Sequence, residues 1–213
     1  MERMTAGDPA ASKWIAVESL LATGVTLYLA LRLDRPSVWA VVPVVLLALP
    51  GRRPEDYGLD ARLTPPPLRG HLLLGAAALL GYTAAHFLVV RWLTGASFSP
   101  RLPPEPGWLL VQQLVVVAFP EELFFRGYLQ SNLNRIFARP FRLFGARFGP
   151  ALPLQAATFA LCHVVGGDWT RLRVFFFGLL AGWLRERNGA IAAPVVYHAA
   201  ANFWYALLAA SLR

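Results

Sequence analysis

The sequence predicts an all-α fold, a polytopic membrane helix bundle with about seven transmembrane helices. Of its 213 residues, 56% are hydrophobic and only 15% are charged, whereas an ordinary soluble domain has about 25% charged residues. The apolar residues stand in long blocks, and a block of about 20 such residues is long enough to cross a bilayer. This composition excludes a water-soluble globule. The single cysteine excludes an intramolecular disulfide.

The apolar blocks give the expected helices in chain order. They cover residues 14–31, 37–50, 71–90, 108–137, 151–165, 174–184 and 190–212. The second block is short and contains Pro43, so a kinked, tilted or re-entrant helix is expected there. The fourth block predicts one long helix that is interrupted in its middle by charged residues.

The basic residues lie mostly between the apolar blocks and give a formal net charge of +8. In this setting they indicate topology and contact with anionic lipid, and no nucleic-acid partner is expected. Residues 135–148 place four arginines among phenylalanines without an acidic residue: Arg135, Arg139, Arg142 and Arg147. That pattern predicts an interfacial segment on anionic headgroups, with a solvated basic loop as the alternative. The loops with more basic residues are expected inside, so the N-terminus is predicted to be cytoplasmic, in a bacterial cytoplasmic membrane.

Three charged residues interrupt the long helix at residues 108–137. Insertion scales put the cost of one such charge in a bilayer at roughly 2.5–3.5 kcal/mol, so partners are expected. Glu122 and Arg126 stand at i,i+4 with the acid first, which favours an ion pair on one helical face. Glu121 points to a neighbouring face and has no such partner in its own helix, so it is free to meet another span. The alternative is a structural network of salt bridges without chemistry.

Further polar residues occur in the later apolar blocks. His163 lies near the end of block 151–165, and His198 and Asn202 share one face of the last block at i,i+4. Together with Glu121 they are the parts of a hydrolytic site, because a carboxylate takes a proton from water and a histidine orients that water. A His/Asn pair donates hydrogen bonds to a developing oxyanion. Glu121, His163 and His198 also form a possible zinc set with one open position.

Three motifs occur in order on separate predicted helices: Glu121-Glu122-x-x-x-Arg126, Phe159-x-x-x-His163 and His198-x-x-x-Asn202. They resemble the signature motifs of the CPBP family, the intramembrane endopeptidases of the CAAX prenyl protease and bacteriocin-processing type. The resemblance implies that Glu121 is the general base, that His163 orients the water and that His198 and Asn202 form the oxyanion hole. Supporting roles follow for Glu122 and Arg126, which hold the helix, and for Phe159, which packs beside His163. No cofactor is implied.

The sequence therefore predicts one membrane domain over residues 1–213. Residues 1–107 would supply shell helices, and residues 108–213 would form the motif-bearing catalytic core. The expected activity is cleavage of a membrane-anchored protein or peptide near its C-terminus or leader by glutamate-activated water. The alternatives are a zinc-dependent membrane hydrolase and a non-enzymatic proton-coupled transporter or scaffold.

Overall fold

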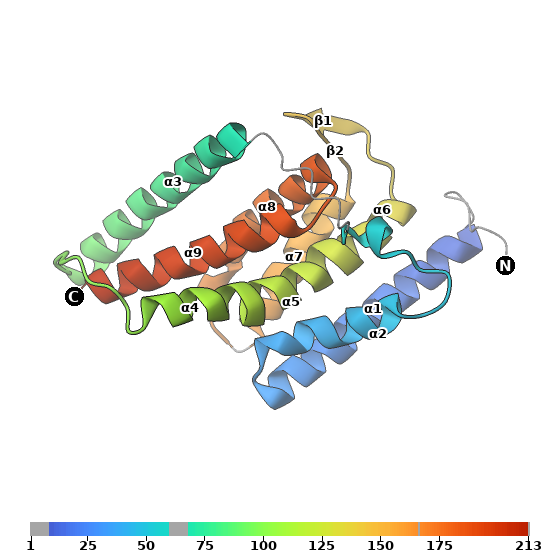
Figure 1. The fold of residues 1–213 in the computed structure, drawn as a ribbon, viewed down its shortest axis with the longest axis horizontal. Coiled ribbons are helices and arrows are strands. Elements are labelled where there is room, and N and C mark those ends of the chain that lie inside the picture. Colours follow the sequence, from blue (N-terminus) through green and yellow to red (C-terminus); the bar gives the residue numbers. More distant parts are fainter. Residues whose placement is uncertain (1–8, 60–67, 166, 213) are drawn as a thin grey trace.

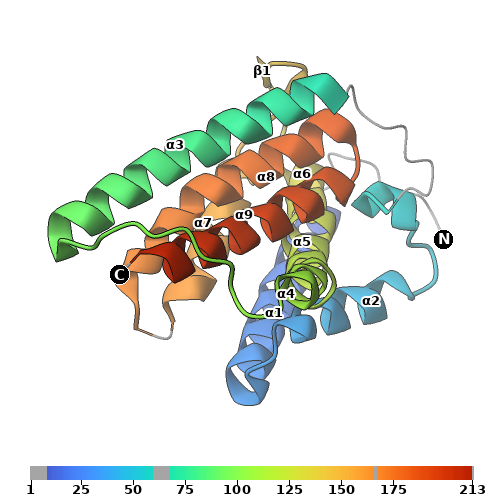
Figure 2. The ribbon, with the colours of Figure 1, turned by 60° about the vertical axis from the view of Figure 1, so that its left-hand side comes forward.

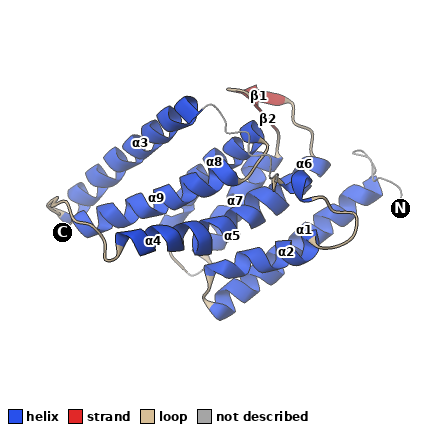
Figure 3. Ribbon diagram, viewed as in Figure 1, coloured by secondary structure: helices blue, strands red, loops and turns tan. Residues whose placement is uncertain are grey.

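A computed structural model describes residues 9–59, 68–165 and 167–212, which form a bundle of helices with a small β-hairpin (Figures 1 and 3). In chain order the elements are α1 (Pro9–Leu33), η1 (Pro36–Ala40), α2 (Val41–Leu47), η2 (Pro54–Tyr57), α3 (Leu68–Thr94), α4 (Pro106–Gln112), η3 (Gln113–Ala118), α5 (Phe119–Glu122), η4 (Leu123–Leu129), α6 (Gln130–Ile136), β1 (Phe141–Leu143), β2 (Ala146–Phe148), α7 (Ala151–Val164), η5 (Trp169–Arg173), α8 (Val174–Asn188) and α9 (Ala192–Ser211). The predicted helical class is confirmed in this coarser form.

The predicted number of spans is not confirmed by the helix lengths. Within the described ranges, two helices are long and apolar enough to cross a membrane, Ala10–Leu33 and Pro106–Ile136. Shorter apolar helices cover Pro36–Leu47 and Ala151–Val164. The block around Pro43 forms η1 and α2, so the expected short segment is a turn of 3-10 helix followed by a brief α-helix.

The central helix runs without a break from α4 to α6, and two of its segments are wound as π-helix. The segments η3 and η4 are π-helical, and they flank α5, which carries Pro120, Glu121 and Glu122. Pro120 has no N–H to donate, and its ring crowds the carbonyl of Val116 four residues earlier. A wider turn before the proline relieves this conflict, and such π turns are frequent at functional sites.

The other helices pack on two sides of the central helix (Figures 1 and 2). α9 contacts η3 on one side, and η1 contacts α5 on the other. α7 and α8 pack against each other, with Gly178 of α8 so close to Ala156 of α7 that an added Cβ would lie 2.9 Å from the Ala156 methyl. Small residues at a helix contact allow this approach in membrane proteins. α3 contacts α9 at the outer edge of the bundle.

An aromatic core fixes the central helix between η1 and α7. The Trp39 ring lies 5.0 Å from Phe124 and 4.8 Å from Phe125, centroid to centroid. Phe125 meets Phe159 of α7 edge to face at 4.9 Å. Edge-to-face packing of this kind stabilises a contact beyond its buried area and sets the rotation of the helix. The turn that bears Glu121 is therefore held in one orientation.

The distribution of polarity is that of a membrane protein. Large apolar side chains face outward along α1 and α3, with Leu20 73% and Trp92 84% exposed. Charged and amide side chains lie inside instead, namely Glu121, Glu122, Arg126, Gln130, Asn132 and Gln155. In lipid, polar groups must find partners within the protein, and apolar groups need no cover.

The segment 135–148 departs from the all-α prediction. α6 ends at Ile136, and β1 pairs with β2 in an antiparallel hairpin whose turn contains Phe144 and Gly145. The alternation of apolar and basic residues favours a strand, and Gly145, with φ +88°, allows the tight reversal. Contact of this segment with headgroups stays a prediction.

Candidate active site

The turn at α5 carries two adjacent buried carboxylates with different surroundings. Glu122 is fully buried, and its Oε1 accepts hydrogen bonds from Arg126 Nη1 at 2.8 Å and from His198 Nδ1 at 2.7 Å. The i,i+4 ion pair expected from the sequence is thus present, and it extends to α9. One carboxylate oxygen therefore links the central helix to the last helix.

Glu121 faces two histidines from two other helices. Its Oε2 lies 3.8 Å from His198 Nε2 and 3.9 Å from His163 Nε2. Both distances exceed a direct hydrogen bond. The residue is only 7% exposed, and Oε2 has no hydrogen-bond partner among the described residues. A buried carboxylate oxygen thus opens toward two imidazole nitrogens, and α5, α7 and α9 together position this group.

The hydrogen bonds of the two imidazoles assign their tautomers. His163 Nδ1 lies 2.7 Å from the Phe159 carbonyl, which can only accept, so Nδ1 carries the proton. His198 Nδ1 donates in the same way to the Glu122 carboxylate. In the neutral rings, both Nε2 atoms are then acceptors that face Glu121. Three acceptors converge on one point, which suits a small hydrogen-bond donor such as water.

Arg126 is the largest fully buried side chain of the described residues. Its guanidinium carbon lies 4.5 Å from the Phe159 ring centroid and 5.8 Å from that of Phe177, while Nε and Nη2 have no described hydrogen-bond partner. Cation–π contacts with these rings partly replace hydration. The Phe159 ring also lies 4.4 Å from the ring of His163, centroid to centroid, which is the packing that the family resemblance implied.

Asn202 is held by a residue that the motifs do not include. Its Nδ2 donates to Gln113 Oε1 at 2.9 Å, and Gln113 belongs to the π turn η3. The described hydrogen bonds do not join Asn202 to His198, its neighbour one turn earlier on α9, or to Glu121. Gln113 is a polar side chain in an apolar block, and this is the signal in the sequence that could have identified it.

A second polar network lies apart from Glu121 and ties α1 to the central helix. Glu18 pairs through both carboxylate oxygens with Arg52 and accepts a hydrogen bond from Tyr128 Oη at 2.5 Å. The hydrogen bond with Glu18 raises the pKa of Arg52 above its ordinary value, so this arginine stays charged. No sequence pattern indicates this pairing, because the two partners are 34 residues apart.

The described side chains do not form a ready-made metal site. Within residues 9–59, 68–165 and 167–212, no set of three or more His, Cys, Asp or Glu side chains is arranged to hold a metal ion. The possible zinc set consists of Glu121, His163 and His198. In this set the Glu121 carboxylate lies 3.8–3.9 Å from the two Nε2 atoms. The zinc alternative is therefore a matter for direct experiment.

One comparison with known proteins finds a family. The model of the type II CAAX prenyl endopeptidase Rce1-like family matches residues 103–204, which contain all three motifs and the whole group around Glu121. This match confirms the resemblance to the CPBP and CAAX protease family. Neither a curated protein nor a solved structure matches the chain.

Proposed function

We propose that this protein is an intramembrane endopeptidase in which Glu121 activates water. Residues 103–204 match the Rce1-like family of type II CAAX prenyl endopeptidases, a family of membrane proteases. The observation that carries the proposal is the convergence of Glu121 Oε2 with the Nε2 atoms of His163 and His198. A general base must lie within reach of the proton that it removes, directly or through one water, and this spacing suits one water.

In the proposed reaction, the water oxygen attacks the carbonyl carbon of the scissile peptide bond while Glu121 takes a proton from it. His163 orients the water through Nε2. The tetrahedral intermediate then collapses, the C–N bond breaks, and Glu121 returns the proton to the leaving amine. The net reaction consumes one water and yields a new carboxyl and a new amino group.

The proposed oxyanion hole consists of His198 and Asn202. His198 donates from Nε2 only when its ring is protonated, and in that form it still pairs with the Glu122 carboxylate through Nδ1. Asn202 gives one amide hydrogen to Gln113, which leaves the second for the oxyanion. Hydrogen-bond donors aimed at the oxygen where charge develops supply much of the catalytic effect in acyl transfer.

The proposed substrate is a membrane-anchored protein or peptide that is cut near its C-terminus or leader. The buried position of Glu121 within an apolar bundle supports a substrate that reaches the site from the bilayer. We place the protein in a bacterial cytoplasmic membrane with its N-terminus inside and its arginine-rich segment 135–148 near anionic headgroups. No cofactor is assigned.

The test compares membrane proteomes of cells that carry wild-type protein, Glu121→Gln or the control Glu55→Gln. Glu55 is an exposed carboxylate in η2. We expect a membrane protein whose C-terminal or leader peptide is cut in wild-type and control cells and intact in Glu121→Gln cells, at equal levels of inserted protein. Identical peptide patterns in all three would contradict proteolysis and favour a proton-coupled transporter or a scaffold.

A chelator separates the two hydrolytic alternatives once a substrate is known. We expect the purified protein to keep its cleavage rate after treatment with a zinc chelator, because Glu121 alone activates the water. Loss of activity that added zinc restores would replace this mechanism with that of a zinc-dependent hydrolase.

A further inference from the structure

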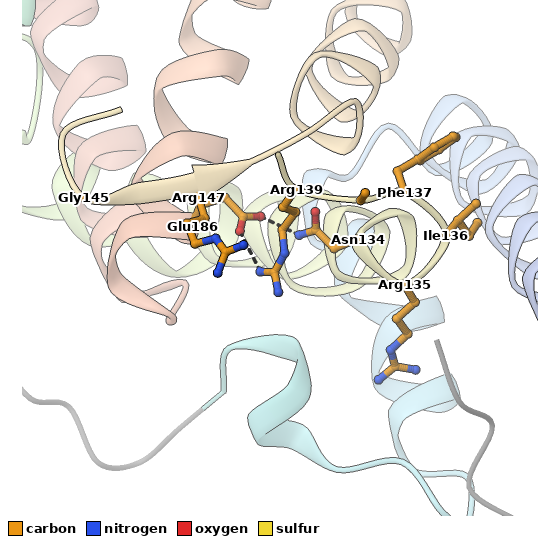
Figure 4. Close-up of a pocket in the computed structure, with 9 residues that line it drawn as sticks. Asn134, Arg135, Ile136, Phe137, Arg139, Gly145, Arg147 and Glu186 are labelled. Carbon is orange, nitrogen blue, oxygen red and sulfur yellow. Dashed lines mark hydrogen bonds and ion pairs between the residues drawn. The ribbon is translucent and has the colours of Figure 1, made fainter. Parts of the chain in front are cut away.

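A cavity of about 630 Å³ lies at the end of the bundle that bears the β-hairpin (Figure 4). Its lining comes from the end of α6 and the loop that follows it, from the turn and second strand of the β-hairpin, and from the last turn of α8. Three of the lining side chains are the cationic residues Arg135, Arg139 and Arg147, and one is the anionic Glu186. The lining therefore carries an excess of positive charge.

The charges in this cavity are unequally compensated. Glu186 accepts hydrogen bonds from Gln130 at 2.7 Å and Asn134 at 2.5 Å and pairs with Arg139 at 3.2 Å. Arg135 turns away from this group in Figure 4, toward Tyr57 and Asp56 of η2. Arg147 forms no ion pair with a residue that the structure describes, so the uncompensated positive charge lies on the hairpin.

The hairpin register places a second arginine directly opposite the first. Arg142 of β1 and Arg147 of β2 are partners across the two strands, so their side chains leave the same face. Arg142 likewise has no ion pair with a described residue. Like charges directly opposite in a sheet destabilise it, and an anion between them would remove the repulsion.

The apolar residue Phe144 stands at the tip of the hairpin, where the backbone conformation favours asparagine or glycine. Phe144 has φ +45° and is 79% exposed, and Gly145 follows with φ +88°. Tight turns with two positive φ values favour Asn-Gly, and a bulky residue is strained there. An exposed aromatic ring at a strained position indicates an apolar partner. Phe141 and Leu143 of β1 are exposed as well, and they leave the face of the hairpin opposite to Arg142.

We infer that this hairpin is a binding site for the headgroup of an anionic phospholipid. The lipid phosphate lies between Arg142 and Arg147, beside the cavity that Arg147 lines, and Phe144 enters the boundary between headgroups and acyl chains. A free phosphate ion would satisfy the arginines, but it gives Phe144 no apolar partner. The inference rests on the membrane placement in the proposed function and is independent of proteolysis.

The experiment measures lipid binding to the purified full-length protein in a zwitterionic detergent by native mass spectrometry. Phosphatidylglycerol, phosphatidylcholine and inorganic phosphate are added separately to wild type, R142Q/R147Q and the control R171Q/R173Q. The control removes two exposed arginines from η5, at the other end of α7 and α8, with the same change in net charge. We expect wild type and control to prefer phosphatidylglycerol, and R142Q/R147Q to lose roughly fivefold in affinity for each arginine removed.

Two further measurements distinguish a lipid site from a bare phosphate site and from a hairpin with a structural role alone. R142Q/R147Q should melt at or above the wild-type temperature without lipid, because it removes a like-charge pair. Phe144→Asn should weaken phosphatidylglycerol binding without lowering lipid-free stability, since asparagine suits the turn. Equal phosphatidylglycerol binding by wild type and R142Q/R147Q would overturn the inference. A melting temperature of R142Q/R147Q below that of wild type would also overturn it. So would a rise in the melting temperature of wild type with inorganic phosphate equal to the rise with phosphatidylglycerol.

Discussion

Glu121 and Glu122 are identical and adjacent, and their surroundings give them opposite energetic roles. Glu122 compensates the buried Arg126 and accepts a hydrogen bond from His198. Glu121 holds a buried oxygen that no described donor satisfies. Proteins commonly tolerate such strain where a reactive group must be kept ready.

The same substitution should therefore change stability in opposite directions at these two residues. Glu122→Gln leaves Arg126 as an uncompensated buried charge and should lower the free energy of unfolding by about 3–5 kcal/mol. Glu121→Gln gives the two histidine nitrogens an amide donor and should raise it by on the order of 1 kcal/mol. Thermal melting in detergent checks both. Equal destabilisation by the two substitutions would contradict these separate roles.

Gln113 is expected to act by positioning Asn202. Gln113→Met removes the oxygen that accepts from Asn202 Nδ2 and should reduce kcat by roughly tenfold, less than the loss of a whole oxyanion donor, with KM nearly unchanged. The control is Gln112→Met, an exposed neighbour in the same helix. Steady-state kinetics on the identified substrate gives kcat and KM for both variants. A tenfold loss in both variants would indicate a general effect of helix polarity instead.

The site residues that could be predicted from the sequence are the polar ones that stand in apolar blocks. Glu121, Glu122 and Arg126 are charges in an apolar block, and His163 and His198 are similarly conspicuous. Gln113 stands out as a polar residue in an apolar block, but nothing in the sequence links it to Asn202, and nothing links Glu18 to Arg52. Hydropathy patterns carry no information on which helices meet, so long-range polar pairs are invisible to them.

The packing of α7 against α8 positions His163, which lies near the end of α7. Gly178→Val should lower stability by about 1–3 kcal/mol, because any Cβ there lies 2.9 Å from the Ala156 methyl and 3.0 Å from its Cα. The resulting displacement of α7 should also reduce cleavage. Melting and activity are compared with Gly24→Ala in α1, where nothing lies within 4 Å of an added Cβ. Stability of Gly178→Val equal to that of wild type would contradict the close packing.

The helices were predictable because apolar blocks of this length have few other folded forms in a membrane. The β-hairpin was not foreseen, although its apolar and basic residues alternate around the turn at Gly145. Four arginines in the segment favoured an interfacial interpretation over a strand. The two π turns were also beyond prediction, since Pro120 marks a disturbance of the helix without specifying how it is accommodated.

For the whole molecule, buried charges and exposed apolar side chains support a membrane protein, while its orientation is still a prediction. Cys162 is the one cysteine, so Cys162→Ser provides a background for single cysteines at the exposed residues Arg53 and Trp169. With the N-terminus inside, a membrane-impermeant maleimide on intact cells should label Trp169→Cys and spare Arg53→Cys. The reverse pattern would invert the topology, and labelling of both would contradict a span between them.

Glu121 is proposed to activate the water, and single-turnover cleavage by purified Glu121→Gln measures that contribution separately from substrate binding and product release. The variant keeps the shape of the side chain, so substrate binding and folding should persist. We predict that the cleavage rate falls by on the order of 10² to 10⁴ while the melting temperature is equal to or above that of the wild type. A folded variant that cleaves within about threefold of the wild-type rate would exclude Glu121 as the general base, because the loss of a general base slows the reaction by more than that.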